Sequence, residues 1–186
     1  MQRDNDANLI EEKISSEDIF DGVLLHVKKD QVRLPNGDIT VREWIKHPGA
    51  ASVLPITKEN KVILVRQYRY PVGMVTLEIP AGKLDKGEDP LECAKRELGE
   101  ETGYTAQNYR YLTKLATTVG FSDELIYLYL ATDLAKGEQH TDEDEFINVV
   151  ELSFKEAWEK IYSGEIIDGK SIVSILMAKE LLGIEV

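Results

Sequence analysis

The chain has 186 residues, a formal net charge of -12 at pH 7 and a hydrophobic fraction of 42%. This length suits one globular domain with its own core and a small accessory element. The acidic balance argues against nonspecific binding to nucleic acid, which requires a basic surface. No apolar run approaches the roughly 20 residues of a membrane helix, so we expect a soluble protein without a membrane partner.

Residues 1–18 are polar and mostly acidic. They lack the basic start and the apolar stretch of a secretion signal. Cys93 is the single cysteine, so the chain can form no internal disulfide. Both features predict a cytoplasmic protein.

Two strands are predicted between Gly22 and Ile45. They flank Asn36 and Gly37, a pair that supplies the positive φ angles of a tight hairpin turn. We therefore expect residues 1–47 to form an N-terminal β-hairpin region and residues 48–186 to form the main domain.

The main domain alternates apolar runs with polar breaks, a pattern typical of a mixed sheet. The expected strands are AASVLPI, VILVRQY, LEIPAG, YRYLTKLAT, ELIYLYLAT and EFINVVEL. Two helices follow. Ser153 and Glu156 form a capping box before the first, and Gly183 ends the second, which covers about residues 170–182.

Residues 82–104 read GKLDKGEDPLECAKRELGEETGY and predict a helix of about three turns. Asp89 is its cap, Pro90 suits the first position, Glu92 completes a capping box, and Gly103 closes the far end. We expect Cys93 to be a half-buried residue of this helix.

The faces of this helix differ. At 100° per residue an apolar stripe lies beside an arc of carboxylates. The stripe contains Leu91, Ala94 and Leu98, and the arc contains Glu97, Glu100 and Glu101.

Stability alone does not explain the arc. Each like-charged pair costs about 0.2 to 0.5 kcal/mol, and Gly99 inside the helix costs about 1 kcal/mol relative to Ala. A divalent cation would reverse the repulsion, and ligands that are all oxygen suit Mg²⁺ or Mn²⁺. The alternative is an acidic helix face exposed to solvent.

The spacing of nine residues resembles the signature of a known family, the Nudix box. These residues are Gly82, Glu88, Arg96, Glu97, Leu98, Glu100, Glu101, Gly103 and Tyr104. The resemblance implies an α+β fold, an α/β/α sandwich around a mixed β-sheet with an N-terminal antiparallel β-hairpin subdomain. It also implies hydrolysis of a nucleoside diphosphate linked to another moiety, with water as the nucleophile.

The resemblance further implies roles for residues in and next to the box. The direct metal ligands are expected to be Glu97, Glu100, Glu101 and the carbonyl group of Ala81. Glu88 is expected to act from a second layer or through water, and Arg96 to orient the glutamates. The expected cofactor is Mg²⁺, with Mn²⁺ as the alternative.

Outside the box, HPGAASVLPI, VRQYRYPVG and GEIIDGKSIVSILMAKELL resemble the ADP-ribose pyrophosphatase branch. That branch implies cleavage of ADP-ribose to AMP and ribose 5-phosphate by a domain-swapped homodimer. Arg69 and Arg42 are then expected to contact phosphate or ribose, and Trp44 to stack on adenine. Surface ion pairs for the arginines and ordinary packing for the tryptophan are the alternatives.

The branch also implies a catalytic carboxylate on a later loop. TDEDEF offers Glu143 as the first choice of general base and Glu145 as the second, with a solvated loop as the alternative. Val119 stands where relatives that cleave ADP-ribose usually have Pro. GDP-mannose or another nucleotide sugar is therefore an alternative substrate, and a non-catalytic nucleotide sensor is an alternative function.

Overall fold

The computed structural model describes residues 6–141 and 145–186. The chain divides into two compact units, and each is described by itself. The first unit comprises Met1–His47 and Ala116–Glu124, and the second comprises Pro48–Leu115 and Leu125–Val186. Among the described residues, no helix is long and apolar enough to span a membrane.

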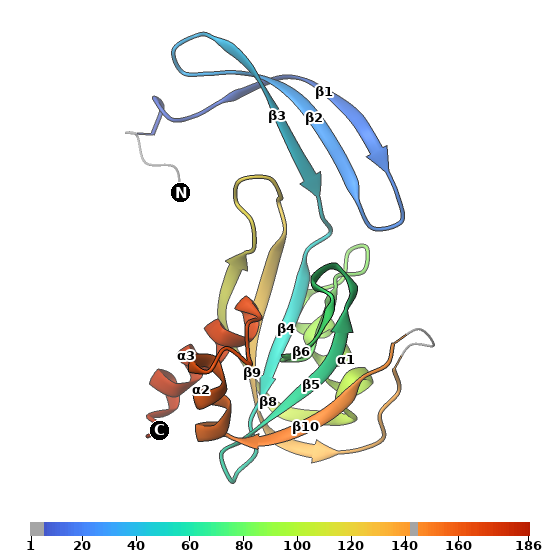
Figure 1. The fold of residues 1–186 in the computed structure, drawn as a ribbon, viewed down its shortest axis with the longest axis vertical. Coiled ribbons are helices and arrows are strands. Elements are labelled where there is room, and N and C mark those ends of the chain that lie inside the picture. Colours follow the sequence, from blue (N-terminus) through green and yellow to red (C-terminus); the bar gives the residue numbers. More distant parts are fainter. Residues whose placement is uncertain (1–5, 142–144) are drawn as a thin grey trace. The chain divides into compact units, whose positions relative to one another are not determined.

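The first unit is built on a three-stranded antiparallel sheet (Figure 1). Its strands are β1 (Glu12–Asp21), β2 (His26–Arg33) and β3 (Ile39–Lys46). A turn does connect β2 to β3, and Gly37 has the predicted positive φ, +93°. The prediction is wrong for Asn36, which is not among the described residues with a positive φ. Strand β1 was not predicted, because its ten residues are all exposed and its few apolar residues do not alternate as in a half-buried strand.

The second unit contains two sheets with the strand orders β10-β5-β6 and β7-β4-β9-β8. The strands are β4 (Ala50–Pro55), β5 (Lys61–Arg69), β6 (Met74–Glu78), β7 (Ala81–Lys83), β8 (Tyr104–Ala116), β9 (Leu125–Lys136) and β10 (Asn148–Ser153). A short 3₁₀ helix, η1 (Tyr70–Val72), connects β5 to β6. Strand β4 runs parallel to β9 and antiparallel to β7, which confirms the predicted mixed sheet.

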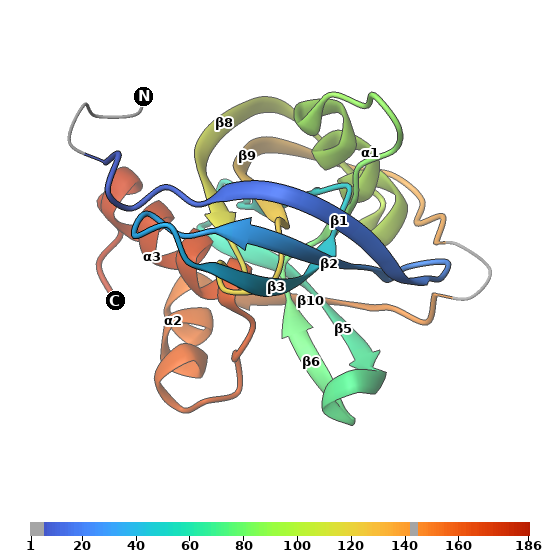
Figure 2. The same cartoon turned by 90° about the horizontal axis from the view of Figure 1, so that it is seen from above.

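Helices cover both faces of the β4–β9 pair (Figure 2). They are α1 (Pro90–Thr102), α2 (Phe154–Tyr162) and α3 (Gly169–Leu182). Successive side chains of a strand point to opposite faces, so Val53 packs in a cluster with Leu98 of α1. Leu54 packs instead with Phe154 of α2 and Ile175 of α3. The resulting α+β architecture agrees with the predicted sandwich.

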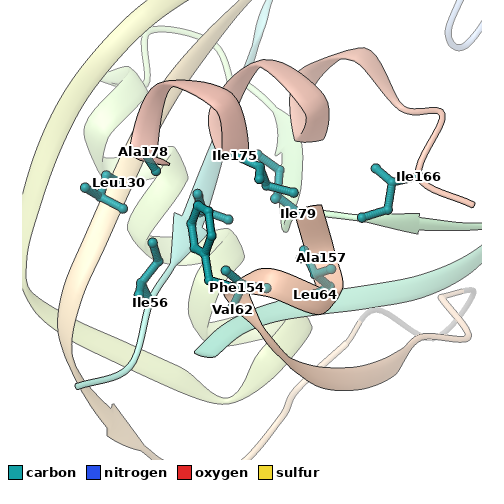
Figure 3. Packing of buried hydrophobic residues seen from close by; sticks show 11 residues of the cluster. Ile56, Val62, Leu64, Ile79, Leu130, Phe154, Ala157, Ile166, Ile175 and Ala178 are labelled. Carbon is teal, nitrogen blue, oxygen red and sulfur yellow. The ribbon is translucent and has the colours of Figure 1, made fainter. Parts of the chain in front are cut away.

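The larger core cluster joins α2 and α3 to the strands (Figure 3). Phe154 is its largest side chain and is almost fully buried. Fully burying a side chain of this size contributes roughly 1.5–3 kcal/mol. This cluster fixes the start of α3 against the end of β6.

The helix ends follow the sequence signals with one exception. Ser153 and Glu156 form the predicted capping box of α2. Asp89 Oδ1 accepts a hydrogen bond from the Leu91 amide at 2.8 Å, but the predicted capping box of α1 is wrong. Glu92 pairs instead with Lys95, whose Nζ lies 2.7 Å from Glu92 Oε1.

Candidate active site

The carboxylates of α1 are more deeply placed than the sequence indicated. The predicted apolar stripe is confirmed, since Ala94 and Leu98 have no exposed surface. Glu97 and Glu101 lie one turn apart and are also buried, whereas Glu100 is only partly covered. Cys93 is fully buried and not half-buried, because it packs in the cluster beneath this helix.

The short strand β7 passes directly over these carboxylates. A β carbon placed on Gly82 would lie 1.8 Å from Glu97 Oε1. The backbone amide of Ala81 donates to Glu101 Oε2 at 3.1 Å. The first glycine of the box is therefore required for the close approach of the strand to the helix.

The two buried carboxylates are poorly compensated. Burial raises the pKa of Glu101 to about 8, and the charges of Glu97 and Glu145 act in the same direction. The Ala81 amide and Lys170 oppose this shift. Burial also raises the pKa of Glu97, against the opposing charge of Arg96. Within this cluster either protons or a cation must offset the negative charge.

Arg96 contacts three carboxylates of the box. Its Nε donates to Glu88 Oε1 at 3.0 Å, and its Nη1 donates to Glu97 Oε1 at 2.6 Å and to Glu100 Oε2 at 2.9 Å. These contacts raise the pKa of the guanidinium. Together with the Asp85 amide, Arg96 lowers the pKa of Glu88 to about 2. Glu88 is therefore ionised across the physiological pH range.

The donor set fits a hard divalent cation. It consists of carboxylate and carbonyl oxygens, and a cation would relieve the unfavourable burial of Glu97 and Glu101. Within residues 6–141 and 145–186, no three acidic, His or Cys side chains converge on one point as they stand. Two of the carboxylates, those of Glu97 and Glu100, bind the same nitrogen of Arg96.

Arg69 is paired with a buried carboxylate. Its Nε and Nη2 each donate at 2.8 Å to Glu78, whose side chain is 4% exposed. The Arg69 side chain is 42% exposed. The alternative for Arg69 was a surface ion pair. Arg69 does form an ion pair, but its partner Glu78 is buried and not on the surface.

Arg42 and Trp44 belong to the first unit, and their contacts lie within it. Arg42 Nε donates to Glu11 Oε2 at 3.0 Å, which matches the surface ion pair considered as its alternative. The indole nitrogen of Trp44 donates to Asp30 Oδ2 at 3.0 Å. Asp30 is buried, and a hydrogen bond from Ser16 is the main factor that lowers its pKa. Their roles toward a ligand stay predictions.

The two loop glutamates differ in what can be said of them. Glu143 lies outside the described residues. Glu145 is described and half-buried, and its charge raises the pKa of both Glu97 and Glu101. The charge of Glu145 therefore acts on the box carboxylates. Val119 is 86% exposed and lies in the part of the first unit formed by residues 116–124.

Sequence reasoning missed a second group of charges around Glu78. Lys170 Nζ donates to Glu78 Oε2 at 2.6 Å and lies 3.0 Å from Asp168 Oδ2. The available signal was a glutamate at the end of a strand and a lysine in the first turn of a helix. Neither position belongs to the box, so its spacing gave no reason to join them.

Two family models match consecutive parts of the chain. Residues 46–172 match the NUDIX domain, and residues 11–45 match the nucleoside diphosphate sugar hydrolase N-terminal domain. The chain belongs to the Nudix family. It is thus a Nudix hydrolase, a member of a family whose hydrolases depend on metal ions.

Several known proteins are similar to this chain over most of their length. The methanol dehydrogenase activator of Bacillus methanolicus is 47% identical, covering 91% of this chain and 93% of the relative. The ADP-ribose pyrophosphatase of Bacillus subtilis is 44% identical, with coverages of 94% and 97%. The GDP-mannose pyrophosphatase of Cronobacter sakazakii is 36% identical, with coverages of 96% and 97%.

A solved structure has a similar fold. It is a crystal structure of an ADP compounds hydrolase with a TM-score of 0.82, covering 93% of this chain and 94% of the other. The sequence identity is 22%, so this likeness concerns the fold alone.

Proposed function

We propose that this Nudix hydrolase cleaves the pyrophosphate bond of ADP-ribose to give AMP and ribose 5-phosphate. The observation that carries the proposal is the buried pair Glu97 and Glu101 beneath β7, in a chain 44% identical to an ADP-ribose pyrophosphatase. Two buried carboxylates with raised pKa values form a site for a cation, and a pyrophosphate needs cations to neutralise it.

Mg²⁺ is the proposed cofactor, with Mn²⁺ as the alternative. The residues that would hold it are Glu97, Glu100, Glu101 and the carbonyl group of Ala81. Bound there, the cation would neutralise the pyrophosphate and lower the pKa of a water molecule.

The protein's own groups supply the remaining steps. Glu143 is the first choice and Glu145 the second choice for the general base that takes the proton from the attacking water. Arg69 binds the phosphate through its guanidinium, and Arg42 and Trp44 contribute to the nucleoside site in a domain-swapped homodimer. Arg96 and Glu88 hold the box carboxylates in place, which their mutual hydrogen bonds support.

Exposed apolar side chains of the first unit support the proposed homodimer. Ile14, Ile19 and Phe20 on β1 and Ile39 and Val41 on β3 are each at least 42% exposed. Exposed apolar side chains in such number on one small sheet are compatible with an interaction site. Light scattering with size-exclusion chromatography should give twice the 21.0 kDa mass of one chain. A monomeric mass at micromolar concentration would overturn the dimer. A cytoplasmic location is part of the same proposal.

A substrate panel tests the proposed activity. Purified protein with Mg²⁺ should release AMP from ADP-ribose, and the Glu97→Gln variant should not. Brisk turnover of GDP-mannose with no AMP from ADP-ribose would transfer the assignment to nucleotide sugars. That outcome is the second candidate, since Val119 departs from the usual Pro and a GDP-mannose pyrophosphatase is 36% identical.

The same panel separates catalysis from regulation. One relative is named as an activator of methanol dehydrogenase, so a regulatory role has a precedent among similar chains. The intact box favours catalysis here. Binding of nucleotides without turnover of any panel compound would support the sensor alternative instead.

A further inference from the structure

A buried glutamate outside the box collects four hydrogen bonds. Glu78, at the end of β6, is 3% exposed and accepts from Arg69 through two nitrogens at 2.8 Å each. Its carboxylate also accepts from Lys170 Nζ at 2.6 Å and from Thr76 Oγ1 at 2.5 Å. These contacts fix the carboxylate so firmly that its position determines where the Arg69 guanidinium lies.

The first turn of α3 holds this part of β6. Lys170 is buried and binds Glu78, and Ser171 Oγ accepts from the Ile79 amide at 2.8 Å. Asp168, the cap of α3, accepts from the Ser171 amide and lies against Lys170. Two neighbouring residues of the helix therefore bind two neighbouring residues at the end of the strand.

This cluster borders the box. Pro80 and Ala81 follow directly after Ile79, and the Ala81 amide binds Glu101. Charges also couple the two groups, since Lys170 acts on Glu101 and Glu101 acts on Arg69. Arg69 thus binds Glu78 directly and is also within electrostatic reach of Glu101, a residue of the proposed cation site.

Arg69 has capacity left for a ligand. Only Nε and Nη2 bind Glu78, and in the described part of the chain its Nη1 has no hydrogen bond. A guanidinium held at one edge presents its free edge in a fixed direction. A group that is already ordered loses little conformational entropy when a phosphate binds.

We propose that Glu78 is a positioning residue: it orients Arg69 for the phosphate of the substrate, and Lys170 and Ser171 hold Glu78 in place. The inference rests on the proposed function of Arg69. The competing explanation is a buried ion pair that serves stability alone, which many such pairs do.

A double-mutant cycle between Glu78 and Arg69 tests the proposal. The variants are Glu78→Gln, Arg69→Gln and their combination, assayed on whichever panel compound the wild-type protein turns over best. Glu78→Gln should raise KM roughly tenfold with a smaller change in kcat, because it weakens binding before and during the reaction. The double variant should be no worse than Arg69→Gln, since Glu78 acts through Arg69.

The positioning role would be overturned if the fold-changes of Glu78→Gln and Arg69→Gln multiplied in the double variant. An unchanged KM in Glu78→Gln would overturn it as well. Glu151→Gln is the matched control, because it breaks an exposed pair with Lys61 on the neighbouring strand and should leave KM unchanged. If Glu78→Gln fails to fold, Glu78→Gln with Lys170→Met removes both buried charges and takes its place in the cycle. A wild-type protein inactive on ADP-ribose but active on another compound would defeat the substrate assignment while leaving this test intact.

Discussion

Two buried glutamates of the second unit have opposite surroundings. Glu78 faces Arg69 and Lys170, and these cations lower its pKa to about 2 although burial alone would raise it. For Glu101, burial and then the charges of Glu97 and Glu145 raise the pKa to about 8, and the charge of Lys170 opposes them only weakly. The charge of Glu78 is thus already neutralised by cationic side chains of the protein. The charge of Glu101 is not, and needs a proton or a cation to neutralise it. This difference agrees with the two proposed roles, in which Glu78 orients Arg69 and Glu101 binds a cation.

The largest expected effect concerns the buried carboxylates of Glu97 and Glu101, whose negative charges the protein leaves poorly compensated. Glu97→Gln or Glu101→Gln should lower kcat by roughly 10³-fold, because each removes a charged ligand of the proposed cation, which would stabilise the transition state. Steady-state kinetics with Mg²⁺ measures the loss. Glu92→Gln is the control, since Glu92 is an exposed glutamate on the same helix. The kcat of this variant should be near that of the wild-type protein. Near-normal activity in both box variants would show that the metal binds elsewhere.

The next effect contrasts the two glutamates in stability. Glu78→Gln leaves two cations facing a neutral amide and should cost about 3 kcal/mol of unfolding free energy. Glu101→Gln should leave the metal-free protein equally or more stable, because it removes a buried repulsion. Urea unfolding in the presence of a chelator compares them. Equal losses of unfolding free energy in the two variants would contradict the distinction between a compensated and an uncompensated glutamate.

A smaller effect is the pH dependence of the metal-free protein. The folded pKa of Glu101 is raised, so its contribution to stability is present below pH 4.5 and is lost as the pH rises toward 8. The folded pKa of Glu78 is lowered, so its contribution is present above pH 4.5 and is lost as the pH falls toward 2. Melting temperatures with a chelator should therefore decline on both sides of about pH 5. Glu101→Gln should flatten the decline on the alkaline side, and an unchanged slope would refute the attribution.

The same comparison explains how far the sequence could predict this molecule. The α1 helix carries its own cap, stripe and terminal glycine, so local signals predicted it well. The box spacing then identified the carboxylates, since one helix fixes their mutual positions. The Glu78 cluster joins residues 92 positions apart, Glu78 and Lys170, and depends on how α3 packs on the sheet. No local pattern encodes such a contact.

Strand β1 illustrates the other kind of failure. Its residues are exposed, and an exposed strand lacks the period of a half-buried one. The capping box at Glu92 failed for a third reason. The Glu92 carboxylate forms an ion pair with Lys95 on the same helix, and Asp89 caps the helix through the Leu91 amide alone.

The smallest expected effects come from two glycines of the box. Gly82→Ala would bring a β carbon within 1.8 Å of Glu97 Oε1, so the Glu97 carboxylate must move, and kcat should fall about tenfold or more. A β carbon on Gly99 would meet nothing within 4 Å, so Gly99→Ala should add about 1 kcal/mol of stability and leave turnover unchanged. Kinetics and urea unfolding of both variants measure the contrast. Because the two glycines differ in what lies above them and not in residue type, a loss of activity in Gly99→Ala would mean that a ligand approaches this face of α1 as well.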